Sequence, residues 1–283
     1  MSATPVTAPP ARFNFARHLI ELNAGRAGKT ALIDDQGQLS YGELAGQVQR
    51  FAGGLAALGL RREERVLLLA HDSSDWVVAF LGCLHAGVVP VAVNTLLTAK
   101  DYAYMLADSR AQAAIVSGAL LPTLQTAMAD GPAPAHLIVS RGTDLPPGAH
   151  DFAALVAGSA PAEAADTHGE EPAFWLYSSG STGAPKGTVH TQANLYWTAE
   201  LYGRAVLGMT ESDVVFSAAK LFFAYGLGNA LSFPLSVGAT VLLMAERATP
   251  QAVFRRFTEQ KPTLFCGAPT GYGGMLASPD LPP

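Results

Sequence analysis

Residues 177–187 read YSSGSTGAPKG and place three glycines, four serine or threonine hydroxyls and one lysine in eleven positions. Glycines let a backbone approach a ligand closely, and successive N–H groups together with hydroxyls form a concave donor surface that suits phosphate oxygens. Lys186 adds a full positive charge. Because the apolar run 173–177 precedes these residues and the strand-like run 188–190 follows them, the pattern predicts a phosphate-binding loop between two strands.

Two other interpretations of this loop are weaker. A P-loop requires GxxxxGK[ST], but Pro185 stands in place of the second glycine, and Gly187 stands in place of the serine or threonine. A P-loop kinase is therefore a distant third hypothesis for the function. A flexible Gly/Ser-rich linker explains the small residues, but it requires neither a lysine behind a proline nor a strand on each side.

The composition excludes some classes of partner. The 283 residues carry 18 basic and 23 acidic side chains, and the net charge of −5 argues against a nucleic-acid partner. Only 14% of the residues are charged, against about a quarter in an average domain, so we expect much buried or ligand-facing surface. Cys83 and Cys266 form no C-x-x-C pair, which favours buried thiols in the reducing cytoplasm.

Two segments bear on export and membranes. Residues 1–12, MSATPVTAPPAR, lack the apolar core of a secretory signal, so we expect a disordered tail and no export. Residues 216–245 are about long enough to cross a bilayer, but glycine, asparagine and proline interrupt them. We interpret that segment as buried α/β structure and expect no membrane partner.

The rest of the chain alternates strand-like and helix-like stretches, which predicts an α/β fold with parallel strands covered on both faces. Ser40 with Glu43, and Thr98 with Asp101, have the spacing of capping boxes and predict helix starts at Tyr41 and Ala99. Expected strands are 65–70, 88–93, 113–116, 136–139, 214–218, 240–244 and 263–266. Expected helices are 75–86, 120–128, 192–207, 225–235 and 250–259. The predicted domains are a tail 1–12, a first α/β subdomain 13–172, the phosphate loop with its strands 173–191, and a second α/β subdomain 192–283.

The eleven-residue loop ending in Pro-Lys-Gly resembles that of the adenylate-forming superfamily of acyl-CoA synthetases, nonribosomal-peptide adenylation domains and luciferases. Residues 217–229, with HTQANLYWTAELYGR at 190–204, look most like the benzoate and hydroxybenzoate CoA ligases. The resemblance covers nearly all of the chain after the tail. It implies the two packed α/β layers of the N-terminal domain of these enzymes, ending before that domain is complete, because the chain stops at Pro283, about halfway through a typical member.

The resemblance also implies a reaction and its site. A small aromatic carboxylate would be activated by ATP and Mg²⁺ to an acyl adenylate and then transferred to coenzyme A. The residues that match the family's phosphate loop are Ser178, Ser179, Gly180, Ser181, Thr182, Gly183 and Lys186, and we assign Thr182 and Lys186 as catalytic. The residues that match its acyl pocket are Phe223, Ala224, Tyr225, Gly226 and Pro269. No residue is assigned as a metal ligand.

Several alternatives stay open at this point. The chain is either a fragment of an aryl-CoA ligase, inactive by itself, or a non-catalytic nucleotide- or acyl-binding module. We expect a possible homodimer and self-association through the face formed by 214–218, 240–244 and 263–266. His190 is expected to order the loop rather than to act chemically. Lys220 is either a surface lysine with its stem on apolar groups, or a buried lysine that is paired or faces the ligand.

Overall fold

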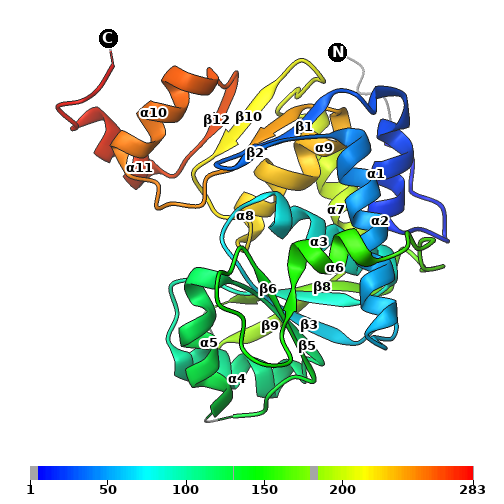
Figure 1. Ribbon diagram of the computed structural model, residues 1–283. Coiled ribbons are helices and arrows are strands. Elements are labelled where there is room, and N and C mark those ends of the chain that lie inside the picture. The colour runs from blue at the N-terminus through cyan, green and yellow to red at the C-terminus, as the bar shows by residue number, and fades with distance from the viewer. Residues whose placement is uncertain (1–5, 130, 179–183, 283) are drawn as a thin grey trace.

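A computed structural model of the chain describes residues 6–129, 131–178 and 184–282. These residues form two sheets with helices between them and on their outer faces (Figure 1). The seven-stranded sheet has the order β7 (His150–Asp151), β6 (His136–Ser140), β5 (Ala113–Ser117), β3 (Arg65–Leu69), β4 (Val89–Ala92), β8 (Pro172–Ser178) and β9 (Lys186–Thr191). The five-stranded sheet has the order β12 (Leu264–Cys266), β10 (Val214–Ser217), β11 (Thr240–Leu242), β1 (Thr30–Asp34) and β2 (Gly37–Ser40). Only β9 and β2 run antiparallel to their neighbours among the strands described.

The helices fall into three groups. Between the sheets lie α1 (Phe15–Asn23), α2 (Tyr41–Ala57) and α3 (Ser74–Ala86). Helices α4 (Ala99–Ser109) and α5 (Leu121–Ala129) cover the outer face of the seven-stranded sheet, and α10 (Pro250–Gln260) and α11 (Pro269–Leu276) cover that of the five-stranded sheet. The remaining helical elements are α6 (Phe152–Gly158), α7 (Gln192–Thr198), α8 (Ala224–Leu227), α9 (Phe233–Val237), the π-helical segments η3 (Ala199–Arg204) and η4 (Gly228–Ser232), and the short 3-10 turns η1 (Ala24–Arg26) and η2 (Gly118–Leu120).

Strand β3 shows why the fold needs helices on both faces of a sheet. Val66 and Leu68 point into the core between the sheets, while Leu67 and Leu69 point into the core under α4 and α5. All four side chains are fully buried. A strand with two covered faces has no reason to alternate polar and apolar residues, and its sequence is therefore a continuous apolar run.

Most elements expected from the sequence are present. Both capping boxes form, so α2 begins at Tyr41 and α4 begins at Ala99 as predicted. Helix α1, the short strands β1, β2 and β7, and helices α6 and α11 were not predicted. Strands β1 and β2 belong to the five-stranded sheet, and β8 and β9 belong to the seven-stranded one. The predicted subdomain boundary at residue 172 therefore does not coincide with the division between the sheets.

Two expectations need correction. Ala11 and Arg12 of the predicted tail pair with residues 168 and 169, so that end of the segment is ordered. The face expected to drive self-association is covered over β10 and β11, since Val215, Phe216 and Val241 are fully enclosed between α10 on one side and the inner helices on the other, while β12 at its edge is half-buried. Self-association itself stays a prediction. The cover on both faces of these strands agrees with the predicted α/β arrangement. The homodimer stays a prediction.

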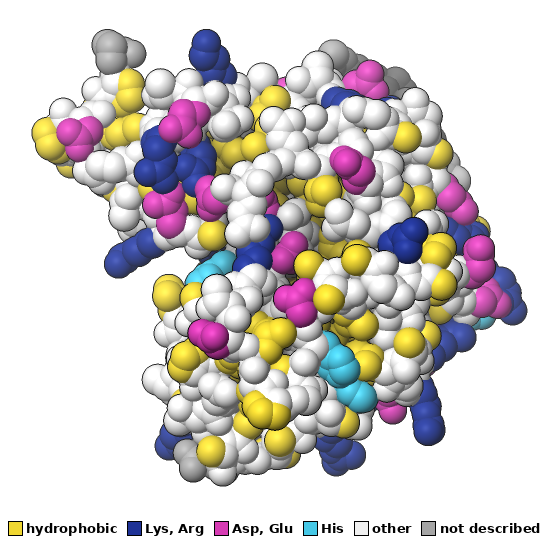
Figure 2. All heavy atoms as spheres, in the orientation of Figure 1, with side chains coloured by type: hydrophobic (Ala, Val, Ile, Leu, Met, Phe, Trp, Pro, Cys, Tyr) yellow, Lys and Arg dark blue, Asp and Glu magenta, His cyan; other side chains and the backbone are white. Residues whose placement is uncertain are grey.

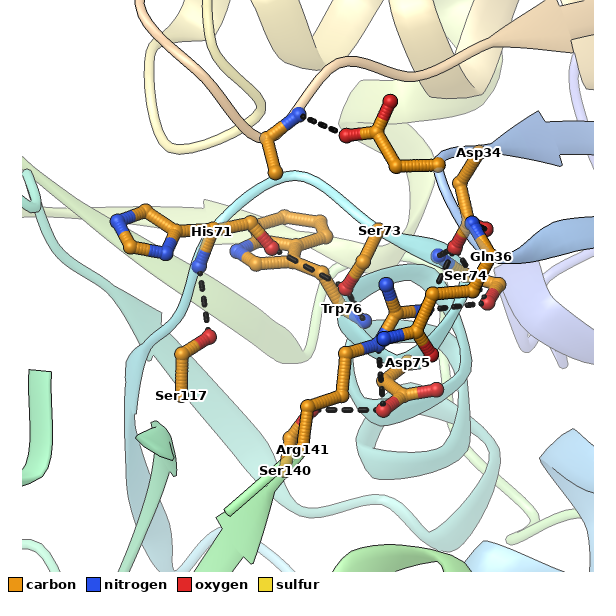
Figure 3. A network of polar contacts seen from close by, with 12 residues as sticks. Asp34, Gln36, His71, Ser73, Ser74, Asp75, Trp76, Ser117, Ser140 and Arg141 are labelled. Carbon is orange, nitrogen blue, oxygen red and sulfur yellow. Dashed lines mark hydrogen bonds and ion pairs between the residues drawn. The ribbon is translucent and has the colours of Figure 1, made fainter. Parts of the chain in front are cut away.

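A polar network joins the two sheets at the carboxyl ends of their strands (Figure 3). Asp34, at the end of β1, accepts hydrogen bonds from the backbone N–H of Ser74 at 2.9 Å and from Arg141 at 2.6 Å. Arg141 follows β6 of the other sheet and also contacts Asp75, which accepts from the Ser140 hydroxyl at 2.7 Å. Burial favours the neutral form of Asp34, but the bonds from Ser74 and Arg141 hold its pKa below the ordinary value.

Beside this junction the surface is indented. Figure 2 shows the face hollowed between the part of the molecule that carries α10 and α11 and the part that contains the seven-stranded sheet. Basic and acidic side chains are interspersed on that face. The hollow follows from two sheets that approach each other through their strand ends and do not stack over their full width.

We predict that Arg141→Met destabilises the protein by roughly 2 to 3 kcal/mol, because it leaves the buried Asp34 carboxylate without its cation. The free energy of unfolding in urea measures this loss. Arg17→Met removes a pair with Glu21 in which both side chains are more than half exposed, and should cost less than about 1 kcal/mol. Equal losses in the two variants would show that the junction is not held by this charge.

Candidate functional site

The predicted phosphate loop is the connection of a β-hairpin. Strand β8 ends at Ser178, β9 begins at Lys186, and these two residues are partners in the antiparallel register. The two flanking strands predicted from the sequence are therefore confirmed. Ser179, Gly180, Ser181, Thr182 and Gly183 lie outside the described residues, and their predicted phosphate contacts stay predictions.

Helix α4 fixes both ends of this hairpin. The Tyr104 hydroxyl donates to the carbonyl of Pro185 at 3.1 Å, just before β9. The Tyr177 hydroxyl, near the end of β8, donates to the Asp108 carboxylate at 2.6 Å. Burial and the bond to Asp108 raise the pKa of Tyr177, so its hydroxyl stays protonated and remains a donor. Sequence reasoning missed Tyr104 and Asp108, although their i, i+4 spacing places them on one face of a helix.

A cavity of about 690 Å³ opens beside the hairpin. It lies at the carboxyl ends of the parallel strands β4 and β8, where ligands bind in open α/β sheets. Its lining is mostly apolar with a few polar groups, the composition usual for small-molecule sites. The lining residues are Ala92, Asn94, Leu97, Met105, Leu176, Tyr177, Ser178, Pro185, Thr188, His190, Phe222, Phe223 and Ala224.

His190 lies in this lining and is held by an aromatic contact. Its ring stacks on Phe174 with ring centroids 4.6 Å apart and an interplanar angle of 4°. Burial lowers the pKa of His190, and Asn194 opposes that effect only in part, so the imidazole is neutral at pH 7. A neutral ring offers the cavity one donor or one acceptor. The stacking fits the predicted ordering of the hairpin, and a chemical role for His190 is untested.

The predicted acyl-pocket residues separate into two groups. Phe223 and Ala224 line the cavity together with Ser178, so the structure brings them beside the hairpin. Tyr225 is half exposed, does not line the cavity, and donates to the carbonyl of Gly267 at 3.3 Å. Pro269 is an exposed residue at the start of α11 and does not line the cavity either.

Gly226 has a packing role in this arrangement. A Cβ atom at this position would lie 2.0 Å from the carbonyl oxygen of Lys220, which no real side chain allows. The glycine therefore permits the tight turn that carries Phe222, Phe223 and Ala224 into the cavity lining. A second cavity, of about 280 Å³, lies behind the turn and is lined in part by Ala218, Ala219, Gly267 and Ala268.

Of the two alternatives, Lys220 is the lysine that is paired, and its side chain is partly buried. Its ammonium donates to the carbonyls of Met244 and Glu246, the latter at 2.7 Å. Burial lowers the pKa of Lys220, and the nearby Asp72 carboxylate opposes this. Asp72 follows β3, is 4% exposed, and accepts from the backbone N–H of Leu221 at 3.1 Å. Burial raises the pKa of Asp72 to about 6, against the attraction of Lys220.

The described residues contain neither a cluster of metal-ligating side chains nor a membrane-spanning helix. Over 6–129, 131–178 and 184–282, no three His, Cys, Asp or Glu side chains are grouped so as to hold a metal ion. No helix in that part of the chain is both long enough and apolar enough to cross a membrane. The segment 216–245, which has the length of a span, folds instead into strands and short helical pieces.

The sequence matches the family of AMP-binding enzymes over residues 20–282, and the chain belongs to that family. Among curated relatives, it is 54% identical to a benzoate–CoA ligase of Thauera aromatica, over 98% of this chain and 53% of the relative. It is 45% identical to a 4-hydroxybenzoate–CoA/benzoate–CoA ligase of Rhodopseudomonas palustris, over 94% of this chain and 50% of the relative.

Solved structures agree with the fold. A benzoate CoA ligase from Burkholderia xenovorans LB400 is 56% identical with a TM-score of 0.89, over 95% of this chain and 53% of that one. The anthranilate CoA ligase AuaEII in complex with anthranoyl-AMP is 37% identical with a TM-score of 0.93, over 96% of this chain and 53% of that one. The predicted family resemblance and α/β fold are confirmed. The chain spans about half the length of the relatives it matches.

The raised pKa of Asp72 predicts a pH effect on stability. A carboxyl group that binds its proton more tightly when folded favours the folded state less as pH rises. The wild-type protein should therefore lose stability relative to Asp72→Asn between pH 4 and about 6.5, by roughly 3 kcal/mol for the interval from 3.8 to about 6. Urea unfolding at several pH values measures the difference. Asp144→Asn, at an exposed position, serves as control, and a flat difference for Asp72→Asn would contradict the prediction.

Proposed function

We propose that the protein carrying this chain is an aryl-CoA ligase that activates a benzoate-type carboxylate with ATP and transfers it to coenzyme A. The observation that supports this most strongly is the cavity of about 690 Å³. The cavity is lined at one end by Ser178, where β8 of the hairpin ends, and at the other by the apolar residues Phe223 and Ala224. An enzyme that adenylates an aromatic acid must hold the acid and ATP in adjoining sites, so that a carboxylate oxygen can reach the α-phosphorus.

The chemistry follows from the poor reactivity of a carboxylate. In the proposed reaction a carboxylate oxygen attacks the α-phosphorus of ATP, pyrophosphate leaves, and an acyl adenylate forms. The thiol of coenzyme A then attacks the acyl carbon, and AMP leaves with the bonding electrons of the acyl–oxygen bond. The chain contributes by positioning the reactants and by stabilising charge, without a protein nucleophile.

The hairpin is proposed to hold the β- and γ-phosphates. Lys186 begins β9 beside Ser178 and supplies positive charge where pyrophosphate develops. Mg²⁺ would accompany ATP and be bound by phosphate oxygens and water, an environment that suits this ion. The chain's own task is to hold the two ends of the hairpin connection, which Tyr104 and Tyr177 do through their bonds to Pro185 and Asp108.

The aromatic substrate is proposed from the other part of the lining. Phe222, Phe223 and Ala224 present apolar surface to the cavity, and the small Ala224 leaves space for a flat ring. An aromatic ring beside phenylalanine gains about 1 kcal/mol beyond its area burial. The relatives whose names include benzoate, 4-hydroxybenzoate and anthranilate support the same substrate class, as does the anthranoyl-AMP bound to one of them. A cytoplasmic location is part of the proposal.

ATP–pyrophosphate exchange tests this function. The complete polypeptide that contains the chain would be assayed with benzoates, fatty acids and amino acids. Exchange that depends on benzoates supports the proposal, and exchange with fatty or amino acids alone would overturn the substrate class. Nucleotide binding without any exchange would support the alternative of a non-catalytic binding module.

Lys186→Ala should lower the rate of benzoate-dependent exchange about 100-fold while changing the KM for benzoate less than about threefold. The reason is that its charge acts on the departing pyrophosphate and has no contact with the aryl group. Steady-state exchange kinetics measure both quantities. Lys100→Ala, an exposed lysine on α4, is the matched control. A raised KM for benzoate with an unchanged rate would be inconsistent with this role.

Ala224→Leu should raise the KM for benzoate at least about tenfold, because the added carbons fill the space beside the hairpin. The KM for ATP should change little. Ala219→Leu makes the same change of size at a residue that lines the smaller cavity behind the turn, and should affect benzoate less. If Ala219→Leu has the larger effect, the aryl group occupies the smaller cavity instead.

A further inference from the structure

Residues 220–224, called here the 220–224 turn, carry one apolar side of the cavity lining, at Phe222, Phe223 and Ala224. The turn is closed by a hydrogen bond from the N–H of Phe223 to the carbonyl of Lys220 at 3.0 Å. Helix α8 begins directly after it, with the N–H of Leu227 donating to the carbonyl of Phe223 at 2.8 Å. The place of Phe223 and Ala224 in the cavity therefore depends on where this turn is held.

Asp72 holds the turn from the opposite sheet. It lies in the connection from β3 to α3, and its Oδ1 accepts from the N–H of Leu221 at 3.1 Å. Both groups are buried, since Asp72 is 4% exposed and Leu221 is fully enclosed. A hydrogen bond from an N–H to a carboxylate is stronger than a neutral one, and its loss in a buried place leaves an N–H unsatisfied.

The connection that carries Asp72 is itself fixed. The N–H of His71 donates to the Ser117 hydroxyl at 3.0 Å, and the Ser73 hydroxyl donates to the His71 carbonyl at 3.2 Å (Figure 3). The Ser73 side chain also caps α3 by accepting from the N–H of Trp76. Asp72 therefore offers its carboxylate from a connection that is hydrogen-bonded on both sides, directly after β3 of the seven-stranded sheet.

Lys220 holds the other side of the turn. Its ammonium donates to the carbonyls of Met244 and Glu246, which follow β11 of the five-stranded sheet. Its charge also attracts Asp72 across the junction. The turn is thus attached to one sheet through Lys220 and to the other through Leu221.

We propose that Asp72 is a positioning residue for aryl selectivity, acting through the N–H of Leu221 on the 220–224 turn. This inference rests on the proposed function, because it assumes that the cavity receives the aryl acid. Asp72 does not line the cavity, so it would act on an acid bound there only through the turn. A turn released from Asp72 lets Phe223 and Ala224 move, so the cavity accepts benzoate less tightly and rejects larger acids less well.

The test compares Asp72→Ala, Asp72→Asn and Asp34→Asn in the complete polypeptide. Asparagine keeps an oxygen that can accept from Leu221, whereas alanine does not. Asp34→Asn alters the other buried carboxylate of the junction, which has no bond to the 220–224 turn. This variant therefore shows how much a loss of stability at the junction changes the KM for benzoate when the 220–224 turn keeps its bond to Asp72.

In ATP–pyrophosphate exchange, Asp72→Ala should raise the KM for benzoate at least about tenfold and the KM for ATP less than about threefold. Asp72→Asn should restore most of the benzoate KM, and Asp34→Asn should leave it unchanged. Equal effects of Asp34→Asn and Asp72→Ala on benzoate, or an unchanged benzoate KM in Asp72→Ala, would overturn the inference.

Hydrogen exchange without substrate gives a second measurement. The amides of the 220–224 turn should exchange at least about tenfold faster in Asp72→Ala than in the wild type, and this does not depend on the reaction. If the wild type shows no benzoate-dependent exchange of pyrophosphate, the proposed function fails, and hydrogen exchange still decides whether Asp72 holds the turn. If amide exchange in the turn is the same in Asp72→Ala as in the wild type, Asp72 does not hold the turn and the inference is overturned.

Discussion

The structure depends on placing two buried carboxylates where the strand ends of its two sheets meet. Asp34 belongs to the five-stranded sheet and is satisfied by Ser74 and Arg141, which follow strands of the seven-stranded sheet. Asp72 follows a strand of the seven-stranded sheet and is satisfied by Leu221, which follows a strand of the five-stranded one. Each buried charge is thus paired across the junction, and neither can be separated from its partner without a large cost in desolvation.

Of these two contacts, only the one between Asp72 and Leu221 reaches a segment that lines the cavity. One side of the cavity comes from β4, β8, β9 and α4, all attached to the seven-stranded sheet, while the other comes from the 220–224 turn that follows β10. The width of the cavity is therefore the distance between two separately built layers. The apolar core shared by the two layers, which includes Leu221 and Phe222, sets most of that distance, and the bond from the N–H of Leu221 to Asp72 adds a directional contact at the turn itself.

The sequence predicted the local features and missed the distant ones. The capping boxes at Ser40 and Thr98, the apolar run of β3 and the hairpin around the loop are set by neighbouring residues, and each was predictable. The pairing of Asp34 with Arg141 joins positions 107 residues apart, and the Tyr104 contact to Pro185 joins positions 81 apart. The hydrophobic periodicity of a sequence reports local structure and carries no information about such long-range contacts. Strand β1 was missed for a related reason, because its parallel partner β11 lies far along the chain, with Leu32 opposite Val241, 209 residues later.

The two parts of the cavity lining differ in how they can distinguish ligands. The hairpin presents hydroxyls and backbone groups at Ser178 and Thr188, which suit any nucleoside triphosphate, whatever acid is activated. The 220–224 turn presents apolar surface, where one methylene more or less is worth about 1 to 3 kcal/mol, and only when the surface is rigid. An apolar surface held by apolar contacts alone could shift to fit a larger acid at little cost. Attachment of the turn to Asp72 of one sheet, and through Lys220 to the other, makes such a shift expensive. Under the proposal above, polar groups outside the cavity lining would then supply the rigidity that aryl selectivity needs.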